Sequence, residues 1–365
     1  MGVKCVPKVS CRMLRELEFR CCEDLAPLPE DFGQLKALES LFLVGVAGIT
    51  DLPDSFEQLQ RLHSLSIYGC YDLSSLPSSL PHLSSLTSLH LNAPNLLALP
   101  DGFGRSSCLR EFSLCEESFT RLPDSLTLAT ALQQLALHDL HSLTSLPDDL
   151  GNLTSLRELE IERCSQLLRI PDSLCRLSSL TRLTVRDCCA LAALPHVMGD
   201  GPHSLQHLTL GCNIQTSLPP SFFRLTSLEE LGMFQLPCVR GPLPDAFSRF
   251  THLRDLSLAA TPHLTALPPS LAAVAPTLTS LRVEFCHGLE ELAEEFFGQL
   301  AMLESLTLSH LKSLKSLPRS LMELPRLQKL VVWLCSELGK SACDVLVGGS
   351  SASIRSNGSG SSSWE

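Results

Sequence analysis

Residues 153–177 of the chain read LTSLRELEIERCSQLLRIPDSLCRL. From Leu156 onward the spacing is L-x-x-L-x-L-x-x-C-x-x-L-x-x-(L/I)-P-x-x-L-x-x-L, and this pattern returns with small changes along almost the whole chain. Self-similarity at a fixed period of about 20–50 residues is typical of proteins built from stacked repeats. The pattern therefore predicts a solenoid in which each copy forms one coil.

The first part of the pattern, L-x-x-L-x-L, occurs in fourteen close copies whose first leucines lie 23 to 25 residues apart. These leucines are Leu14, Leu38, Leu62, Leu86, Leu109, Leu132, Leu156, Leu180, Leu205, Leu228, Leu253, Leu278, Leu303 and Leu327. Because all copies have nearly the same length, they are expected to stack as equivalent coils.

Alternation of apolar and polar residues predicts a strand inside each copy. Leu159 and Ile161 point to one side, whereas Glu158, Glu160 and Glu162 point to the other, which is the period-two pattern of a half-buried strand. Since each connection returns the chain in the same direction, the strands are expected to be parallel and in register. The predicted fold class is an α/β repeat: a curved solenoid of about 14 coils with one parallel concave sheet.

A proline after a leucine or isoleucine marks the back of twelve coils, and only Leu292-Ala293 departs from this pattern. Proline fixes its own φ and biases the preceding residue to extended conformations, so the chain is expected to turn there. The segment that follows has Asp172 where a helix cap is wanted and apolar residues three apart, Leu174 and Leu177. It predicts one turn of α- or 3-10 helix with its leucines facing the core.

A cysteine recurs six residues after the start of the strand, at Cys22, Cys70, Cys164, Cys188, Cys286 and Cys335. We interpret it as a small residue that fills a tight buried corner, with its weak S–H donor near backbone carbonyls. The chain has 16 cysteines but no C-x-x-C pair, so no zinc ribbon is expected. The scattered histidines predict no other metal site.

Three regions follow from the extent of the repeats. Residues 1–13 form an N-terminal segment, residues 14–338 the repeat domain, and residues 339–365 a C-terminal region. Within that last region, residues 341–347 are expected to form a small closing element. The Gly- and Ser-rich residues 348–365 are expected to be a disordered tail.

Composition excludes several classes of function. The net charge of -11 argues against nucleic-acid and anionic-membrane partners, which require a cationic surface. No signal peptide or membrane-spanning run is apparent, so a cytoplasmic location is expected, although the Asn152 sequon leaves a secreted alternative open. Because no catalytic motif or phosphate-binding loop occurs, we expect no enzyme activity, no cofactor and no small-molecule substrate.

The repeated pattern is identified as a leucine-rich repeat. Its combination of cysteine with Leu-Pro, clearest in residues 62–83 and 180–195, resembles the recognition region of plant nucleotide-binding leucine-rich-repeat disease resistance proteins. The resemblance implies a horseshoe with short helical or 3-10 segments on its convex side. It also implies recognition of a protein in innate immunity and signal transduction: a pathogen effector, a guarded host protein or a signalling protein.

The resemblance has one large departure, because only thirteen residues precede the repeats where those receptors carry a nucleotide-binding switch domain. The expectation is therefore the ligand-sensing part alone, without nucleotide-switched signalling. Plant Ras-group-related repeat proteins use a closely similar Leu-Pro coil. A cytoplasmic scaffold that assembles signalling proteins consequently remains the alternative.

The residues that the pattern leaves free are the candidate binding residues. Adding one period places Glu158 beside Arg182 and Glu162 beside Arg186 on the concave face, which predicts either surface charge pairs or a recognition patch. Large aromatic residues on the same face favour a macromolecular partner. The candidate protein-binding residues are Glu158, Glu160, Glu162, Arg182, Arg186, His207, Phe234 and Trp333.

Overall fold

The computed structural model describes residues 11, 13–23, 25, 27–105, 108–116, 118–201, 204–211, 218–236 and 243–338. Most of the N-terminal segment, the expected closing element and the expected tail lie outside these residues. The chain divides into two units, Met1–Ser204 and Leu205–Glu365.

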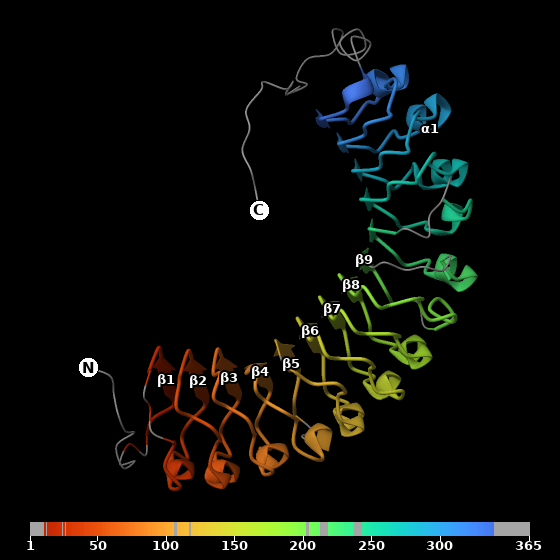
Figure 1. Cartoon of the computed structure of the whole chain (residues 1–365). Coiled ribbons are helices and arrows are strands. Elements are labelled where there is room, and N and C mark those ends of the chain that lie inside the picture. The colour runs from red at the N-terminus through yellow and green to blue at the C-terminus, as the bar shows by residue number, and fades with distance from the viewer. Residues whose placement is uncertain are drawn as a thin grey trace. The chain divides into compact units, whose positions relative to one another are not determined.

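The described part of the first unit contains eight parallel five-residue strands that follow one another in sequence order (Figure 1). They are β1 (Glu16–Arg20), β2 (Ser40–Val44), β3 (Ser64–Tyr68), β4 (Ser88–Asn92), β5 (Glu111–Cys115), β6 (Gln134–His138), β7 (Glu158–Glu162) and β8 (Arg182–Arg186).

The second unit repeats this arrangement with strands β9 (His207–Gly211), β10 (Glu230–Phe234), β11 (Asp255–Ala259), β12 (Ser280–Glu284), β13 (Ser305–Ser309) and β14 (Lys329–Trp333). Each pairs in parallel with the strand before or after it, without any shift of register. The predicted leucine-rich-repeat solenoid is confirmed.

Strand β7 shows the predicted alternation. Leu159 and Ile161 are fully buried, whereas Glu158, Glu160 and Glu162 are half-buried on the other face. The predicted register is also confirmed, because Glu158 lies opposite Arg182 and Glu162 lies opposite Arg186. In-register stacking follows from the period of two, since a slip by one residue would turn every buried leucine of a strand to solvent.

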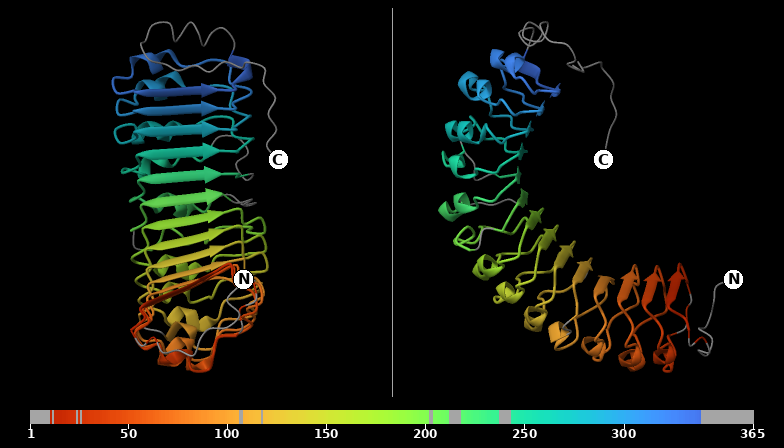
Figure 2. Two further views of the ribbon diagram at one scale, coloured as in Figure 1. Left: turned by 90° about the vertical axis from the view of Figure 1, so that its left-hand side faces the viewer. Right: turned by 180° about the vertical axis from the view of Figure 1, so that it is seen from behind.

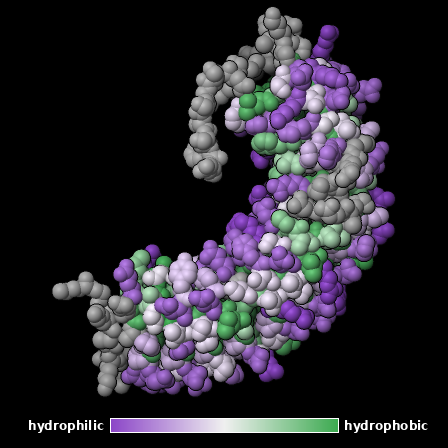
Figure 3. All heavy atoms as spheres, viewed as in Figure 1, coloured by the Kyte–Doolittle hydropathy of each residue, from purple (hydrophilic) through white to green (hydrophobic). Residues whose placement is uncertain are grey.

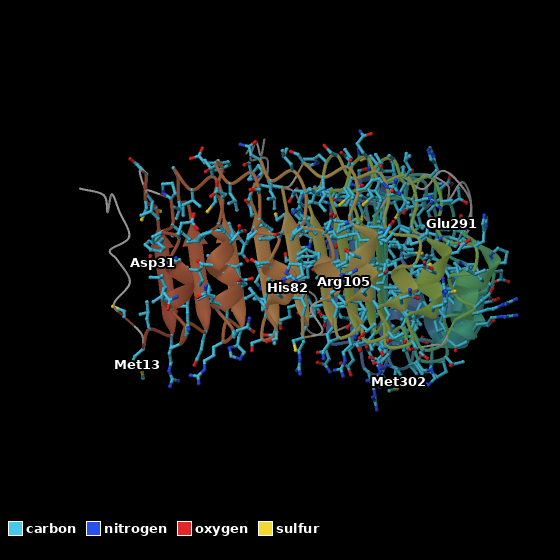
Figure 4. All side chains as sticks on the ribbon, turned by 90° about the horizontal axis from the view of Figure 1, so that it is seen from below. Met13, Asp31, His82, Arg105, Glu291 and Met302 are labelled. Carbon is cyan, nitrogen blue, oxygen red and sulfur yellow. The ribbon has the colours of Figure 1, made fainter. Side chains whose placement is uncertain are left out.

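Short 3-10 helices lie on the side of the coils opposite to the sheet (Figures 1 and 2). In the first unit they are η1 (Phe32–Gln34), η2 (Asp54–Gln58), η3 (Leu80–His82), η4 (Phe103–Arg105), η5 (Asp124–Leu128), η6 (Leu150–Asn152) and η7 (Asp172–Arg176). Asp31, His82 and Arg105, which Figure 4 labels, lie along this row of helices.

The second unit has η8 (Pro220–Arg224), η9 (Phe247–Arg249), η10 (Pro269–Val274) and η11 (Arg319–Glu323) at the equivalent places, whereas η12 (Ser336–Leu338) lies in the bend directly after β14. An α-helix, α1 (Glu294–Gly298), replaces the 3-10 helix in the coil where Ala293 stands for the usual proline. There the N–H of Phe297 donates to the carbonyl of Ala293 at 3.2 Å, which is the i to i−4 bond of an α-helix.

The prediction of an aspartate cap is wrong. Pro171 occupies the N-cap position of η7, and no side chain caps the helix. Asp172 already lies inside the first turn, and the carbonyl of Pro171 accepts the N–H of Leu174 at 3.0 Å. Leu174 and Leu177 are buried, so the prediction that they face the core is confirmed.

Glycine and serine set the distance between neighbouring 3-10 helices. The N–H of Gly151 donates to the hydroxyl of Ser173 in the next coil at 3.1 Å, and Gly33 makes the same bond to Ser55 at 3.0 Å. A Cβ atom on Gly151 would lie 2.2 Å from the carbonyl oxygen of Ser173. Only glycine therefore permits this close approach of two backbones.

The cysteine prediction is confirmed where the coil is enclosed on both sides. Cys164 is fully buried, and its thiol donates to the carbonyls of Leu137 and Glu162, both at 3.6 Å. Burial raises the pKa of Cys286 to about 11, so its thiol remains a neutral donor at pH 7. Cys22 and Cys335, from the first and last described coils, are half-buried.

The residue directly after a strand has a positive φ in most coils. We call this row the post-strand column; its non-glycine members are Cys21, Glu116, Asp139, Arg163, Asp187, Gln235, Ala260, Phe285, His310 and Leu334. Gly45 and Gly69 occupy the same position. The N–H of a member extends the ladder by one bond, as for Arg163, which donates to the carbonyl of Arg186 at 2.9 Å. The left-handed conformation is unfavourable for residues with a Cβ, and this hydrogen bond offsets part of that cost.

Candidate functional site

The solvent face of β7 and β8 brings together five of the predicted binding residues. Glu158, Glu160 and Glu162 project from β7, and Arg182 and Arg186 project from β8 directly beside them. All five side chains are half-buried or exposed because the buried positions between them hold leucine, isoleucine and valine. Figure 3 shows hydrophilic side chains gathered over this part of the sheet.

Two glutamates on this face lie at ion-pair distance from residues outside the predicted ladder. Among the described residues, Glu158 and Arg182 lie in register but form no ion pair. Glu160 lies instead 3.4 Å from Nε2 of His138, and Glu162 lies 3.4 Å from Nη1 of Arg163. A pair at this distance on an exposed surface contributes about 0–1 kcal/mol to stability. These charged side chains are therefore not held rigidly by their ion pairs.

His138 contacts Glu160 without a hydrogen bond. Its Nε2 atom is enclosed and lies at ion-pair distance from Oε2 of Glu160, but the angles are not those of a hydrogen bond. His207 in the second unit repeats this arrangement, with Nδ1 at 2.9 Å from Oε2 of Glu230. Both contacts join side chains of neighbouring strands, and both become ion pairs only when the histidine is protonated.

Asp139 and Arg163 form a two-pronged ion pair that sequence reasoning missed. Nε and Nη2 of Arg163 lie 2.6 and 2.9 Å from the two carboxylate oxygens of Asp139. Both residues belong to the post-strand column, which places them one coil apart at the edge of the candidate face. The hydrogen bonds from Arg163 lower the pKa of the Asp139 carboxyl, and partial burial opposes this effect only in part.

Asp139→Asn is expected to lower the free energy of unfolding at pH 7 by about 1 kcal/mol or less, because Arg163 is half exposed. A carboxyl whose pKa is lowered on folding stabilises the fold above its unfolded pKa of about 3.9, and this contribution disappears as pH falls through the folded pKa. The difference between variant and wild type should therefore shrink as the pH falls below the unfolded pKa and close once the pH is below the folded one, as followed by denaturant titrations.

Asp187→Asn is the matched control, because Asp187 has the same backbone conformation two coils further along the chain and asparagine tolerates that conformation equally well. The control should leave the stability within about 0.5 kcal/mol of wild type at both pH values. A pH-independent effect of Asp139→Asn would contradict the assignment.

In the second unit, His207 and Phe234 lie on the neighbouring strands β9 and β10. Phe234 is half-buried rather than exposed, because its ring folds down over Gly232. A Cβ atom on Gly232 would lie 2.7 Å from Cε2 of that ring. Phe234 therefore presents less aromatic surface than its place on the strand suggested.

Exposed aromatic residues occur in both units. Tyr68 is 41% exposed in the first unit and stacks on His90 with ring centroids 6.4 Å apart, whereas Phe42 is half-buried. Trp333 is 50% exposed at the end of β14. His310, which contacts Trp333, and Phe285, which stacks on His310, were not predicted, because both follow their strands instead of lying within them. The recurrence of Gly45 and Gly69 directly after a strand was the signal that marked this column.

Other chemistry has little support in the described part of the chain. The residues that the structure describes contain no cluster of three His, Cys, Asp or Glu side chains arranged to hold a metal ion. Within the same residues, no helix is long and apolar enough to cross a membrane.

The sequence of residues 70–263 matches the family model described as a leucine-rich repeat region. A leucine-rich-repeat protein of Leptospira interrogans has a similar structure, with 23% identity, a TM-score of 0.53 and coverage of 90% of this chain and 93% of that one. The functional domain of InlJ from Listeria monocytogenes, described as including a cysteine ladder, has 18% identity, a TM-score of 0.61 and coverage of 88% and 64%. These likenesses establish the fold alone. The search among curated proteins found no match.

Proposed function

The chain belongs to the leucine-rich repeat family, and from that premise we propose that it is a non-catalytic recognition module that binds a protein partner through the solvent face of its sheet. One observation carries the proposal. In each strand the buried positions are almost uniformly leucine, whereas the outward positions change from coil to coil among acidic, basic, polar and aromatic residues. A surface of varied side chains on a regular scaffold suits recognition of another protein.

The size of the surface favours a macromolecular partner. Adjacent strands lie about 4.8 Å apart, so even one unit presents far more surface than a small molecule needs. The excess of acidic residues opposes binding to nucleic acid or anionic lipid. The partner classes that we propose are a pathogen effector, a guarded host protein or a signalling protein, in plant-type innate immunity.

We place this activity in the cytoplasm. The thiols of Cys164 and Cys188 are buried and donate to backbone carbonyls, which suits a reducing compartment. The chain would then act as the ligand-sensing part of a disease resistance receptor. The predicted binding residues Glu158, Glu160, Glu162, Arg182, Arg186, His207, Phe234 and Trp333 remain the proposed contact residues.

Arg182→Glu combined with Arg186→Glu is expected to reduce partner capture at least tenfold. The new carboxylates would repel the acidic groups of the partner that face the two arginines in the wild-type complex. The measurement is affinity capture from the native cell with quantification by mass spectrometry. Circular dichroism should show an unchanged fold, since neither arginine is buried.

Arg169→Glu combined with Arg176→Glu is the matched control. These arginines lie after β7 and in η7, are 64% and 59% exposed, and pair with Asp148 and Asp149 away from the sheet face. The control changes the net charge equally and should retain capture. If both double variants capture the same partners as wild type, the proposed surface is wrong.

The alternative function is a cytoplasmic scaffold of the plant Ras-group-related type that assembles signalling proteins. The same captured proteins separate the two functions. A nucleotide-binding receptor or a foreign effector among them would favour recognition, whereas a GTPase and its regulators would favour the scaffold.

A further inference from the structure

Three aromatic side chains of the second unit form an exposed cluster where strands β12, β13 and β14 end. Phe285 and His310 directly follow β12 and β13, and Trp333 is the last residue of β14. The rings of Phe285 and His310 stack with centroids 4.1 Å apart at an angle of 17°. The rings of His310 and Trp333 meet at 5.3 Å and 67°. We call Phe285, His310 and Trp333 the aromatic cluster.

The aromatic cluster is held in place by the backbone. The N–H of Phe285 donates to the carbonyl of Ser309 at 2.9 Å, and the N–H of His310 donates to the carbonyl of Trp333 at 2.8 Å. Nδ1 of His310 also lies 2.8 Å from the hydroxyl of Ser309. The cluster is therefore organised before any partner arrives, which reduces the entropy lost on binding.

Exposure of this cluster has a cost. Phe285 is 42% exposed and Trp333 50% exposed, and Figure 3 shows hydrophobic side chains near this end of the described chain. In addition, Phe285 has a φ of 54°, a conformation that a bulky side chain rarely adopts. Large aromatic residues that are both exposed and rigid are typical of binding anchors.

The carboxylate of Glu284 favours a cation at the aromatic cluster. Glu284, the last residue of β12, places a half-buried carboxylate directly before Phe285. Burial lowers the pKa of His310 against the opposite effect of Glu284, so its ring is neutral at pH 7. His287 and Lys312 are the nearby bases, and both act on the pKa of His310 in the direction opposite to Glu284. The faces of neutral aromatic rings attract cations, and a neighbouring carboxylate strengthens this attraction.

We propose that the aromatic cluster and Glu284 receive an arginine or lysine side chain of the protein partner. An apolar occupant would cover the Glu284 carboxylate without pairing it, which is unfavourable. A guanidinium suits the cluster best, because its plane can lie on an exposed ring while its N–H groups donate to the carboxylate. The inference rests on the proposed function, since the cation belongs to the partner.

The experiment uses the full chain and two synthetic peptides, acetyl-Gly-Gly-Arg-Gly-Gly-amide and the same peptide with uncharged citrulline in place of arginine. Ring currents should move the arginine δ-methylene protons upfield in NMR spectra as protein is added. Citrulline keeps the shape and loses the charge, so we expect a shift at least five times smaller. Equal shifts for the two peptides would overturn the proposal.

Variants then locate the site. Trp333→Leu and Glu284→Gln should each reduce the arginine shift by at least half. Tyr68→Leu is the matched control, because Tyr68 is similarly exposed and also stacks on a histidine, in the first unit; it should change nothing. Glu284→Gln keeps the side-chain shape, so it remains informative if the loss of Trp333 disturbs the last described coil. An unchanged shift in both variants would refute the site.

The two tests fail independently. The peptides contain no natural partner sequence, so their outcome does not depend on which protein the chain binds. Unchanged capture by the chain with Arg182→Glu and Arg186→Glu would contradict the proposed binding surface. The cation site would then still stand if the arginine peptide bound, but its natural ligand would be unknown. Equal binding of arginine and citrulline would remove only the cation site.

Discussion

Phe250→Ala lowers the free energy of unfolding of the second unit by about 3–5 kcal/mol, the expected cost of removing a fully buried ring from a core. Phe250 packs among Phe222, Phe223 and Phe247, with ring centroids 5.5 to 6.1 Å away. Alanine leaves a cavity that a regular coil cannot close, because the coils on both sides hold its backbone in register.

Hydrogen exchange under native conditions is the appropriate measurement for Phe250→Ala, because a chain of repeats need not unfold in a single step. Amides of residues 228–236 and 243–259 should exchange at least a hundredfold faster, whereas those of β2 to β6 should change little. Phe285→Ala is the control, since Phe285 is 42% exposed, whereas Phe250 is fully buried, and its loss should cost about 1 kcal/mol or less. Equal effects of the two variants would contradict the packing described.

Gly151→Ala destabilises the first unit by about 1–3 kcal/mol, because the new methyl group would overlap the Ser173 carbonyl of the next coil. The matched control is Gly298→Ala, at the same place in its coil. There α1 replaces the 3-10 helix, and the nearest atom to a new Cβ would be Cβ of Ser320 at an ordinary 3.4 Å.

The two alanine substitutions should therefore have opposite signs. Gly298→Ala should stabilise its unit by about 0.4–1 kcal/mol, because alanine restricts the unfolded chain more than glycine does. Denaturant midpoints for both variants, with circular dichroism as the signal, check the comparison. A destabilisation by Gly298→Ala as large as that by Gly151→Ala would show that the close approach of the coils is not the cause.

Apolar periodicity was sufficient to predict the strands, their register and the buried residues. Leu159 and Ile161 alternate with glutamates, and a one-residue slip would expose both, so only one pairing was acceptable. The buried position of Cys164 could also be predicted. The cysteine recurs at the same distance from each strand, so it occupies the same position in the bend of each coil. These features depend on residue type and spacing alone.

The polar contacts between coils could not be predicted in the same way. The bond from Gly151 to Ser173 depends on the distance between two 3-10 helices, which apolar spacing does not specify. The recurrence of serine two residues after the proline was a signal for it. The pairing of Arg163 with Asp139, and the exposure of Phe285, depend on the left-handed residue that follows each strand.

Contacts between coils run mainly along the axis of stacking, and this has a mechanical consequence. In the first unit, Thr181 donates to the carbonyl of Arg157 and Thr144 to that of Thr120, parallel to the strand ladder. A force applied along this axis would act on the hydrogen bonds between one pair of coils at a time, so these bonds would break one row after another. Each coil that peels away would release roughly 80 Å of slack chain, since an extended residue spans about 3.4 Å. The unit would therefore yield in small steps and behave as a soft spring.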